Sequence, residues 1–176
     1  MKKISFAAFA GLFCICTSCN HDGVNTSYNK ENSQQQQNIA ASDVVNKAFE
    51  KGDVSGIDSV VADDFLDHTD RGDKKGRDSL KAMVKFYYAN FKNMKTEKIR
   101  EVADGDYVWS WMHYSGTTDG SMGIPKGPYD MRGVELSKFK DGKAVEHWGF
   151  MDMQDMMKLM PQADMSNMKM DTTKAK

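Results

Sequence analysis

The sequence predicts an α+β domain in which three N-terminal helices are followed by a curved antiparallel sheet and a short C-terminal helix. Two observations predict this order. Apolar residues recur at helical spacing in the first half of the chain, and they alternate with a period of two from residue 95 onward. Helices followed by consecutive strands are typical of an α+β domain, so we expect the sheet to curl over the helices.

Three helices are predicted ahead of the strands. Ser42 is a good N-cap for the first helix, which ends at Gly52, and Asp53 caps a short second one. Residues 65–69 form a short extended piece. Residues 77–92 are the clearest helix, because their apolar side chains fall at i, i+3, i+4, i+7, i+8 and i+11: Leu80, Met83, Val84, Tyr87, Tyr88 and Phe91.

Strands are predicted between turn signals in the second half of the chain. Their expected ranges are 95–103, 107–118, 129–139 and 143–152. Asp141-Gly142, between two apolar runs, is a strong hairpin signal. A closing helix over 152–160 ends at Pro161.

The N-terminus has the plan of a secretory signal. A basic start at Lys2 and Lys3 precedes a short apolar run, and small residues stand directly before Cys19. Residues 1–18 are too short to remain as a membrane-spanning helix. The segment resembles a bacterial lipoprotein signal, although Cys16 stands where Leu is usual, and an ordinary secretory signal is the alternative. The resemblance implies export and a lipid (palmitate) anchor on Cys19 at a bacterial membrane, either the outer membrane or one facing the periplasm.

Residues 19–41 are predicted to be a flexible linker behind the lipidated cysteine. They are polar and contain Gln34 to Gln37, so they offer little surface to bury. The folded domain is then expected over 42–161, with a polar tail containing methionines over 162–176.

Composition excludes several classes of function. Removal of Lys2 and Lys3 with the signal moves the formal charge from −1 to −3, so no nucleic-acid partner is expected. The mature chain keeps only Cys19, and if that thiol carries a lipid, neither a disulfide nor a catalytic thiol is possible. His68, His113 and His147 are far apart in sequence, and phosphate-binding loops and GxSxG elbows are absent, so no metal and no cofactor is predicted.

Five phrases carry a resemblance to a known family. In chain order they are Gly52-Asp53, 63–68, 103–108, 141–148 and Asp152. Over 42–160 the chain resembles the SnoaL-like polyketide cyclase, or ester cyclase, branch of the nuclear transport factor 2-like superfamily. The resemblance implies a cone-shaped sheet around the helices, with an apolar pocket at its open end. Its enzymes use a pocket acid or base on a carbonyl substrate, and members of the superfamily often dimerise through the open sheet face.

The candidate catalytic residues are His68, His147 and Asp152, since histidines and carboxylates can exchange protons near neutral pH. Two departures weaken the catalytic interpretation. Gly149 stands where many relatives have Asp, and Thr118 stands where they have His. We therefore expect an exported lipoprotein that binds a small, largely apolar or carbonyl-containing molecule. The alternatives are a cofactor-free cyclase, isomerase or hydrolase, and a dimeric interaction module.

Candidate ligand-binding residues lie on two strands: Trp109, Trp111, Met112 and Trp148. Strand alternation separates Trp109 and Trp111 from Met112, and separates Trp148 from His147. The alternation does not say which face lines the cone. The tryptophans could instead pack against the long helix or form a subunit interface.

Methionine is concentrated at the C-terminus, with eight of the fourteen between 151 and 170. Four of them are predicted to be the packed apolar stripe of the closing helix: Met153, Met156, Met157 and Met160. Met165, Met168 and Met170 have no obvious core to enter. Because thioethers suit Cu(I), a copper-binding tail remains open.

Overall fold

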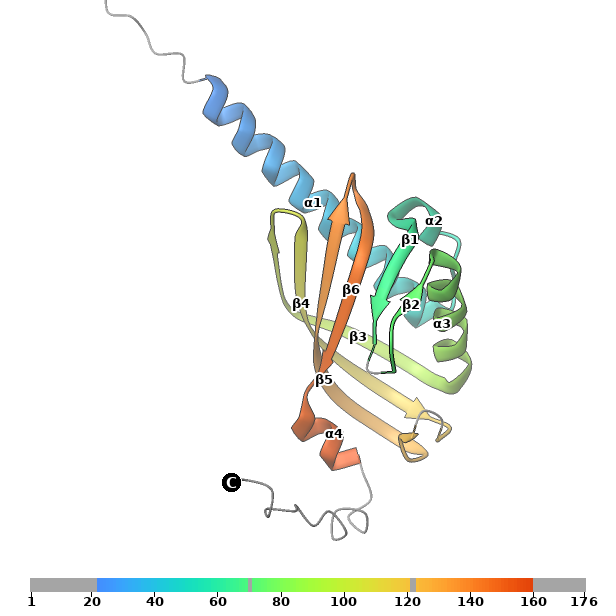
Figure 1. Cartoon of the computed structure of the whole chain (residues 1–176). Coiled ribbons are helices and arrows are strands. Elements are labelled where there is room, and N and C mark those ends of the chain that lie inside the picture. The colour runs from blue at the N-terminus through green and yellow to red at the C-terminus, as the bar shows by residue number, and fades with distance from the viewer. Residues whose placement is uncertain (1–21, 70, 121–122, 160–176) are drawn as a thin grey trace, which may run out of the picture.

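The computed structural model describes residues 22–69, 71–120 and 123–159 (Figure 1). The predictions for the signal, for Cys19 and for the methionines of the tail lie outside these residues. The elements, in chain order, are α1 (Asp22–Lys51), α2 (Ile57–Val60), β1 (Val61–His68), β2 (Lys74–Lys75), α3 (Arg77–Asn90), β3 (Phe91–Asp104), β4 (Tyr107–Thr118), β5 (Gly127–Lys140), β6 (Lys143–Met151) and α4 (Met153–Leu159).

Six strands form one curved sheet in the order β2-β1-β6-β5-β4-β3 (Figure 1). The strands from β3 to β6 pair antiparallel with their neighbours, and β1 adds in parallel beside β6. Bulges in β3, where the register with β4 shifts twice, help to bend the sheet. The α+β fold with a curved sheet, N-terminal helices and a short C-terminal helix is confirmed. Strand β2, which only two residues form, was not predicted.

Helix α1 is much longer than predicted. It begins at Asp22 rather than Ser42, and Figure 1 shows its N-terminal part extending beyond the sheet. Asn38 and Ala41 are buried, so the prediction of a flexible linker through residue 41 is wrong for this stretch. Glutamine is a good helix former, and extending an existing helix costs little once its C-terminal half is packed.

The main hydrophobic core lies between the helices and one face of the sheet. Its buried members come from α1, α2, α3 and most strands: Ala41, Ala48, Ile57, Val61, Phe65, Leu80, Val84, Val108, Phe139 and Ala144. A second cluster contains Phe91, Tyr129 and Met131, and Tyr114 packs against it. In this cluster the rings of Phe91 and Tyr129 meet edge to face at 5.5 Å. These two clusters pack the helices against the inner face of the sheet. Among the described residues, no helix combines the length and apolar character needed to cross a membrane.

Helix α4 is fixed by polar contacts as well as by packing. Asp155 is buried and accepts hydrogen bonds from Arg132 Nε at 2.8 Å and from Arg132 Nη2 at 3.0 Å. Met156 packs against the second cluster, whereas Met153 is 70% exposed and Met157 is 43% exposed. The prediction that Met153 and Met157 fill the core is therefore wrong.

Candidate functional site

The exposure of β4 identifies which face of the sheet is the inner one. Val108, Ser110 and Met112 are buried, whereas Trp109 and Trp111 are each 45% exposed. Met112 therefore lies inside the fold and the two tryptophans lie outside. The alternative that these tryptophans pack against the long helix is wrong.

A chain of hydrogen bonds crosses four strands on the inner face. His147 on β6 is directly paired with Asp67 on β1, and its Nδ1 lies 2.7 Å from Asp67 Oδ1. Its Nε2 lies 2.7 Å from Glu135 Oε2 on β5. Tyr114 on β4 donates its hydroxyl to the other oxygen of Glu135 at 2.5 Å. We call Asp67, His147, Glu135 and Tyr114 the inner polar chain.

The charges within the inner polar chain are fixed by these contacts. Burial alone lowers the pKa of His147, but the hydrogen bonds to Asp67 and Glu135 outweigh it and raise that pKa to about 10. At neutral pH the ring is an imidazolium with both N–H groups donated to carboxylates. Burial, together with the Glu135 charge, raises the pKa of Tyr114, so its hydroxyl stays a donor. Asp67 Oδ2 is buried and has no hydrogen-bond partner among the described residues.

Gly149 makes room for the Glu135 carboxylate. The two residues are opposite one another in the pairing of β5 with β6. A Cβ atom at position 149 would lie 3.1 Å from Glu135 Oε2. The carboxylate therefore occupies space that a side chain at 149 would fill. The sequence interpretation considered position 149 only within its own strand. It missed Glu135 because that residue comes from the neighbouring strand β5.

His68 lies on the opposite side of the sheet from His147. Its ring stacks on Trp148, with centroids 4.7 Å apart. Its Nδ1 lies 3.0 Å from Asp73, and its Nε2 lies 3.5 Å from Glu146. Asp67 and His68 are consecutive in β1 and so point to opposite faces. His68 and Trp148 therefore form an outer cluster that is separate from the inner polar chain.

Asp152 has a structural role at the start of α4. Its Oδ1 accepts hydrogen bonds from the backbone N–H groups of Gln154 at 2.8 Å and Asp155 at 3.3 Å. This is the geometry of a helix N-cap. The structure does not bring His68, His147 and Asp152 together around one ligand.

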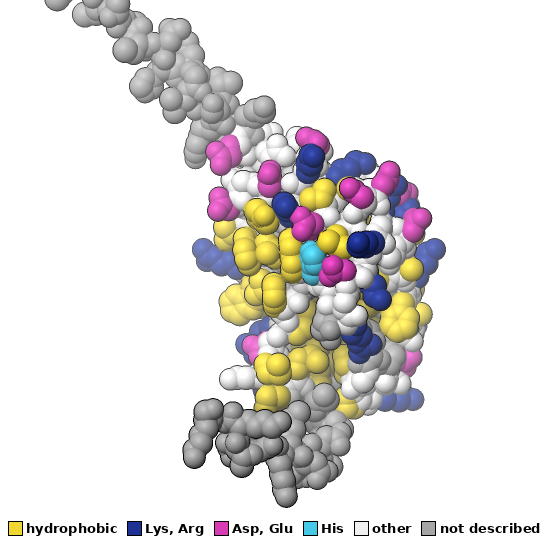
Figure 2. All heavy atoms as spheres, viewed as in Figure 1, with side chains coloured by type: hydrophobic (Ala, Val, Ile, Leu, Met, Phe, Trp, Pro, Cys, Tyr) yellow, Lys and Arg dark blue, Asp and Glu magenta, His cyan; other side chains and the backbone are white. Residues whose placement is uncertain are grey.

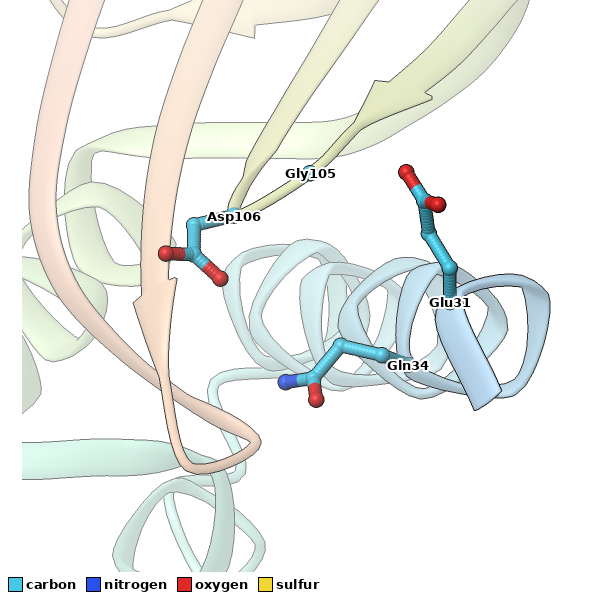
Figure 3. Close-up of a pocket in the computed structure, with 4 residues that line it drawn as sticks. All are labelled: Glu31, Gln34, Gly105 and Asp106. Carbon is cyan, nitrogen blue, oxygen red and sulfur yellow. The ribbon is translucent and has the colours of Figure 1, made fainter. Parts of the chain in front are cut away.

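The described residues line two hollows away from these three side chains. One, of about 230 Å³, lies between α1 and the β3–β4 turn, where Glu31, Gln34, Gly105 and Asp106 line it (Figure 3). The other, of about 320 Å³, is lined by Glu50, Tyr88, Phe91, Lys92, Asn93 and Met94.

The inner polar chain is nevertheless open to solvent at one end. The side chain of His147 is 27% exposed, that of Glu135 is 17% exposed, and Gly149 is an exposed residue. Solvent therefore reaches this end of the chain, although neither of the two hollows is lined by its residues. Within the described ranges, no three His, Cys, Asp or Glu side chains are arranged to hold a metal ion.

Comparison with known proteins agrees with this fold. Residues 39–160 match the family model of the SnoaL-like polyketide cyclases. The chain belongs to this family. Among curated proteins no sequence matches the chain.

Solved structures share the fold at low identity. TsrD from Streptomyces laurentii is 19% identical, with a TM-score of 0.61 over 72% of this chain and 94% of that one. IdmH from Streptomyces antibioticus is 25% identical, with a TM-score of 0.57 over 72% and 97%. An LEH-like epoxide hydrolase from M. tuberculosis is 15% identical, with a TM-score of 0.59 over 71% and 90%.

Proposed function

We propose that this SnoaL-like domain binds a small, largely apolar molecule and holds its polar group at the inner polar chain. The supporting observation is that this partly exposed chain adjoins a buried apolar cluster. Tyr114 belongs to the chain and also packs against the cluster of Phe91, Tyr129 and Met131. An apolar wall with a few fixed polar groups is the usual lining of a small-molecule site.

The contacts of Glu135 favour a ligand with a hydroxyl or carbonyl group. Its carboxylate is held by Tyr114 and His147 and is partly open to solvent. A ligand hydroxyl can donate to the carboxylate while Tyr114 keeps its own hydrogen bond to Glu135. A ligand carbonyl can accept from the Tyr114 hydroxyl if that hydroxyl turns away from Glu135, whose other oxygen stays paired with His147. The hydroxyl contact keeps all the polar groups paired when water leaves the site.

Thermal-shift screening of the full chain against small apolar ketones, esters and lactones tests this proposal. For any compound that binds, Tyr114→Phe should weaken binding about tenfold, because the variant loses the hydroxyl and, with it, the hydrogen bond to the Glu135 carboxylate, which is worth about 1.5 kcal/mol or more and holds that carboxylate in place. Tyr107→Phe is the matched control, because Tyr107 is exposed on the outer face of the same strand. Equal losses in both variants would contradict the proposal.

Acid–base catalysis without a cofactor is the second candidate function. It is favoured because His147 and Tyr114, two groups with strongly raised pKa values, meet at one carboxylate. In this scheme Glu135, rather than Asp152, removes a proton beside a substrate carbonyl and returns it at another position. Glu135→Gln should then abolish turnover of a bound carbonyl compound, whereas Asp152→Asn should preserve it. The reverse result would exclude this assignment.

A third candidate, assembly with a second copy of the chain, rests on the outer sheet face. Val102, Trp109, Trp111 and Phe150 are exposed there, on β3, β4 and β6. Figure 2 shows hydrophobic side chains gathered over the sheet. Exposed apolar patches of this kind mark interaction surfaces. Sedimentation of the full chain should give a dimer that Trp111→Glu dissociates and the exposed control Tyr88→Glu does not. A monomeric wild-type protein would exclude this candidate.

We also propose that the chain is exported and anchored through Cys19 to a bacterial membrane, in the outer membrane or facing the periplasm. The support is the signal pattern of residues 1–18. Helix α1 starts at Asp22, so only Asn20 and His21 separate it from that cysteine. Intact mass measurement of the purified protein should show loss of residues 1–18 and a gain of acyl chains, and Cys19→Ser should abolish both. An unmodified Cys19 in the mature protein would exclude the anchor.

A further inference from the structure

The hydrogen-bond donors of the inner polar chain are all in use. The imidazolium of His147 donates one N–H to Asp67 Oδ1 and the other to Glu135 Oε2. The hydroxyl of Tyr114 donates to Glu135 Oε1 at 2.5 Å. Ser110 lies opposite Glu135 in the pairing of β4 with β5, and its hydroxyl donates to Glu101 at 2.9 Å. A ligand group that only accepts hydrogen bonds therefore meets no free donor on these side chains.

Acceptor positions, by contrast, are left over. A carboxylate oxygen can accept about two hydrogen bonds, and each oxygen of Glu135 accepts one from the inner polar chain. Asp67 Oδ2 is buried and accepts none within the described part of the chain. Two carboxylates also face a single imidazolium, so the inner polar chain carries a net negative charge. Both its free hydrogen-bonding positions and its charge suit a group that brings protons.

Gly149 leaves Glu135 within reach of such a group. The glycine is exposed, and the direction in which its side chain would point leads to Glu135. A Cβ atom there would lie 3.1 Å from Glu135 Oε2 and 3.8 Å from His147 Cε1. An oxygen or nitrogen atom of a ligand that enters this space can donate to the carboxylate at ordinary hydrogen-bond distance.

We propose that the ligand group held at the inner polar chain is a hydrogen-bond donor, a hydroxyl or a protonated amine, and that the site disfavours ketones and carboxylates. This inference rests on the proposed function and narrows its ligand class. A hydroxyl or ammonium group leaves every existing hydrogen bond intact. A ketone must turn the Tyr114 hydroxyl away from Glu135, which breaks a hydrogen bond to a charged group. A carboxylate ligand is in addition repelled by the net negative charge.

Four naphthalenes that differ in a single polar group test the inference. They carry a hydroxymethyl, aminomethyl, acetyl or carboxylate group at the same ring carbon, and the same four groups on cyclohexane repeat the comparison. Calorimetric titration of the full chain at pH 7 should show the alcohol and the amine binding about tenfold more tightly than the ketone, because only the ketone costs a hydrogen bond to a charged group. The carboxylate should bind most weakly. A ketone that binds as tightly as the alcohol and the amine would overturn the inference and leave the proposed function standing, whereas no binding in either series would count against both.

Glu135→Gln distinguishes recognition of the ligand from a structural effect. A glutamine amide donates as well as accepts, so the preference for the alcohol over the ketone should fall about tenfold. Glu97→Gln changes a carboxylate on the outer face and is the matched control, which should keep the wild-type preference. Melting curves establish that each variant is folded. If Glu135→Gln does not fold, Tyr114→Phe replaces it and should widen the preference, because it removes the hydroxyl that a ketone must use. An unchanged preference, or an equal change in the Glu97 control, would overturn the inference.

Discussion

The charge of His147 should make the free energy of unfolding fall as the pH rises from 7 to 9. Its pKa is about 10 in the folded protein and near its ordinary value of 6.5 when unfolded. Between these values the folded state keeps a proton that the unfolded state releases. The stabilisation is therefore complete below pH 6.5 and is lost as the pH approaches 10. The slope is about 1.4 kcal/mol per pH unit, which gives a loss of about 2.5 kcal/mol between pH 7 and 9.

Urea unfolding of the full chain at pH 7, 8 and 9 measures this slope, with His147→Gln as the comparison. The glutamine variant removes the titrating ring, so its free energy of unfolding should change by about 2.5 kcal/mol less over the same range. The pKa of His113 is also raised, by hydrogen bonds to Glu97 and Asp130. Because both proteins contain His113, its contribution cancels in the difference.

Equal slopes in the two proteins would refute the reasoning. They would mean that His147 loses its proton near its ordinary pKa even in the folded state. The contacts with Asp67 and Glu135 would then not hold an imidazolium, and the electrostatic account of the inner polar chain would fail. A His113→Gln variant should keep most of the wild-type slope, because His113 lies on the outer face.

Three further predictions concern the surroundings of the site. Gly149→Ala should lower the free energy of unfolding by about 1 kcal/mol and lower the pKa of His147, because the new Cβ would lie 3.1 Å from Glu135 Oε2 and displace that carboxylate. Urea unfolding measures the first effect and NMR titration the second. An unchanged pKa would count against the contact between His147 and Glu135. Phe139→Ala should cost about 3–5 kcal/mol in urea unfolding, since Phe139 is almost fully buried; a smaller loss would mean that the core collapses around it. Asp155→Asn should speed hydrogen exchange in α4 alone, and exchange spreading into the strands would contradict a local role.

Much of the fold could be predicted from local patterns. The helix predicted over 77–92 and the strand predicted over 107–118 correspond closely to α3 and β4. Each element buries one side against the core, so its apolar residues recur with the period of a helix or of a strand. The N-terminal half of α1 could not be predicted this way. Residues 22–37 show no apolar stripe, and the helix there continues from the packed half that includes Asn38 and Ala41.

The inner polar chain could be predicted only in part. His147 was identified as a candidate, but its partner Glu135 depends on the register between β5 and β6. The hairpin at Asp141-Gly142 pairs Lys140 with Lys143, and continuing that register would place Glu135 opposite Trp148. A bulge between Lys138 and Phe139 shifts the pairing by one residue, so Glu135 faces Gly149 instead. A one-residue shift changes which residue of the neighbouring strand lies opposite a given side chain. The sequence of either strand alone does not reveal such a shift.

Each face of the sheet carries a local exception to the polarity expected of a solvated sheet, and the two exceptions suit two separate functions. A sheet with one open face usually places apolar side chains inward and polar ones outward. Here Ser110, Glu135 and His147 point inward, whereas Trp109 and Trp111 point outward. The inward polar groups suit recognition of a polar ligand group, and the outward aromatic groups suit contact with a partner. Trp111→Glu should therefore change assembly without changing the pKa of His147, and Glu135→Gln should do the opposite. If either variant changed both properties, the faces would be coupled and the two proposals could not be treated as independent.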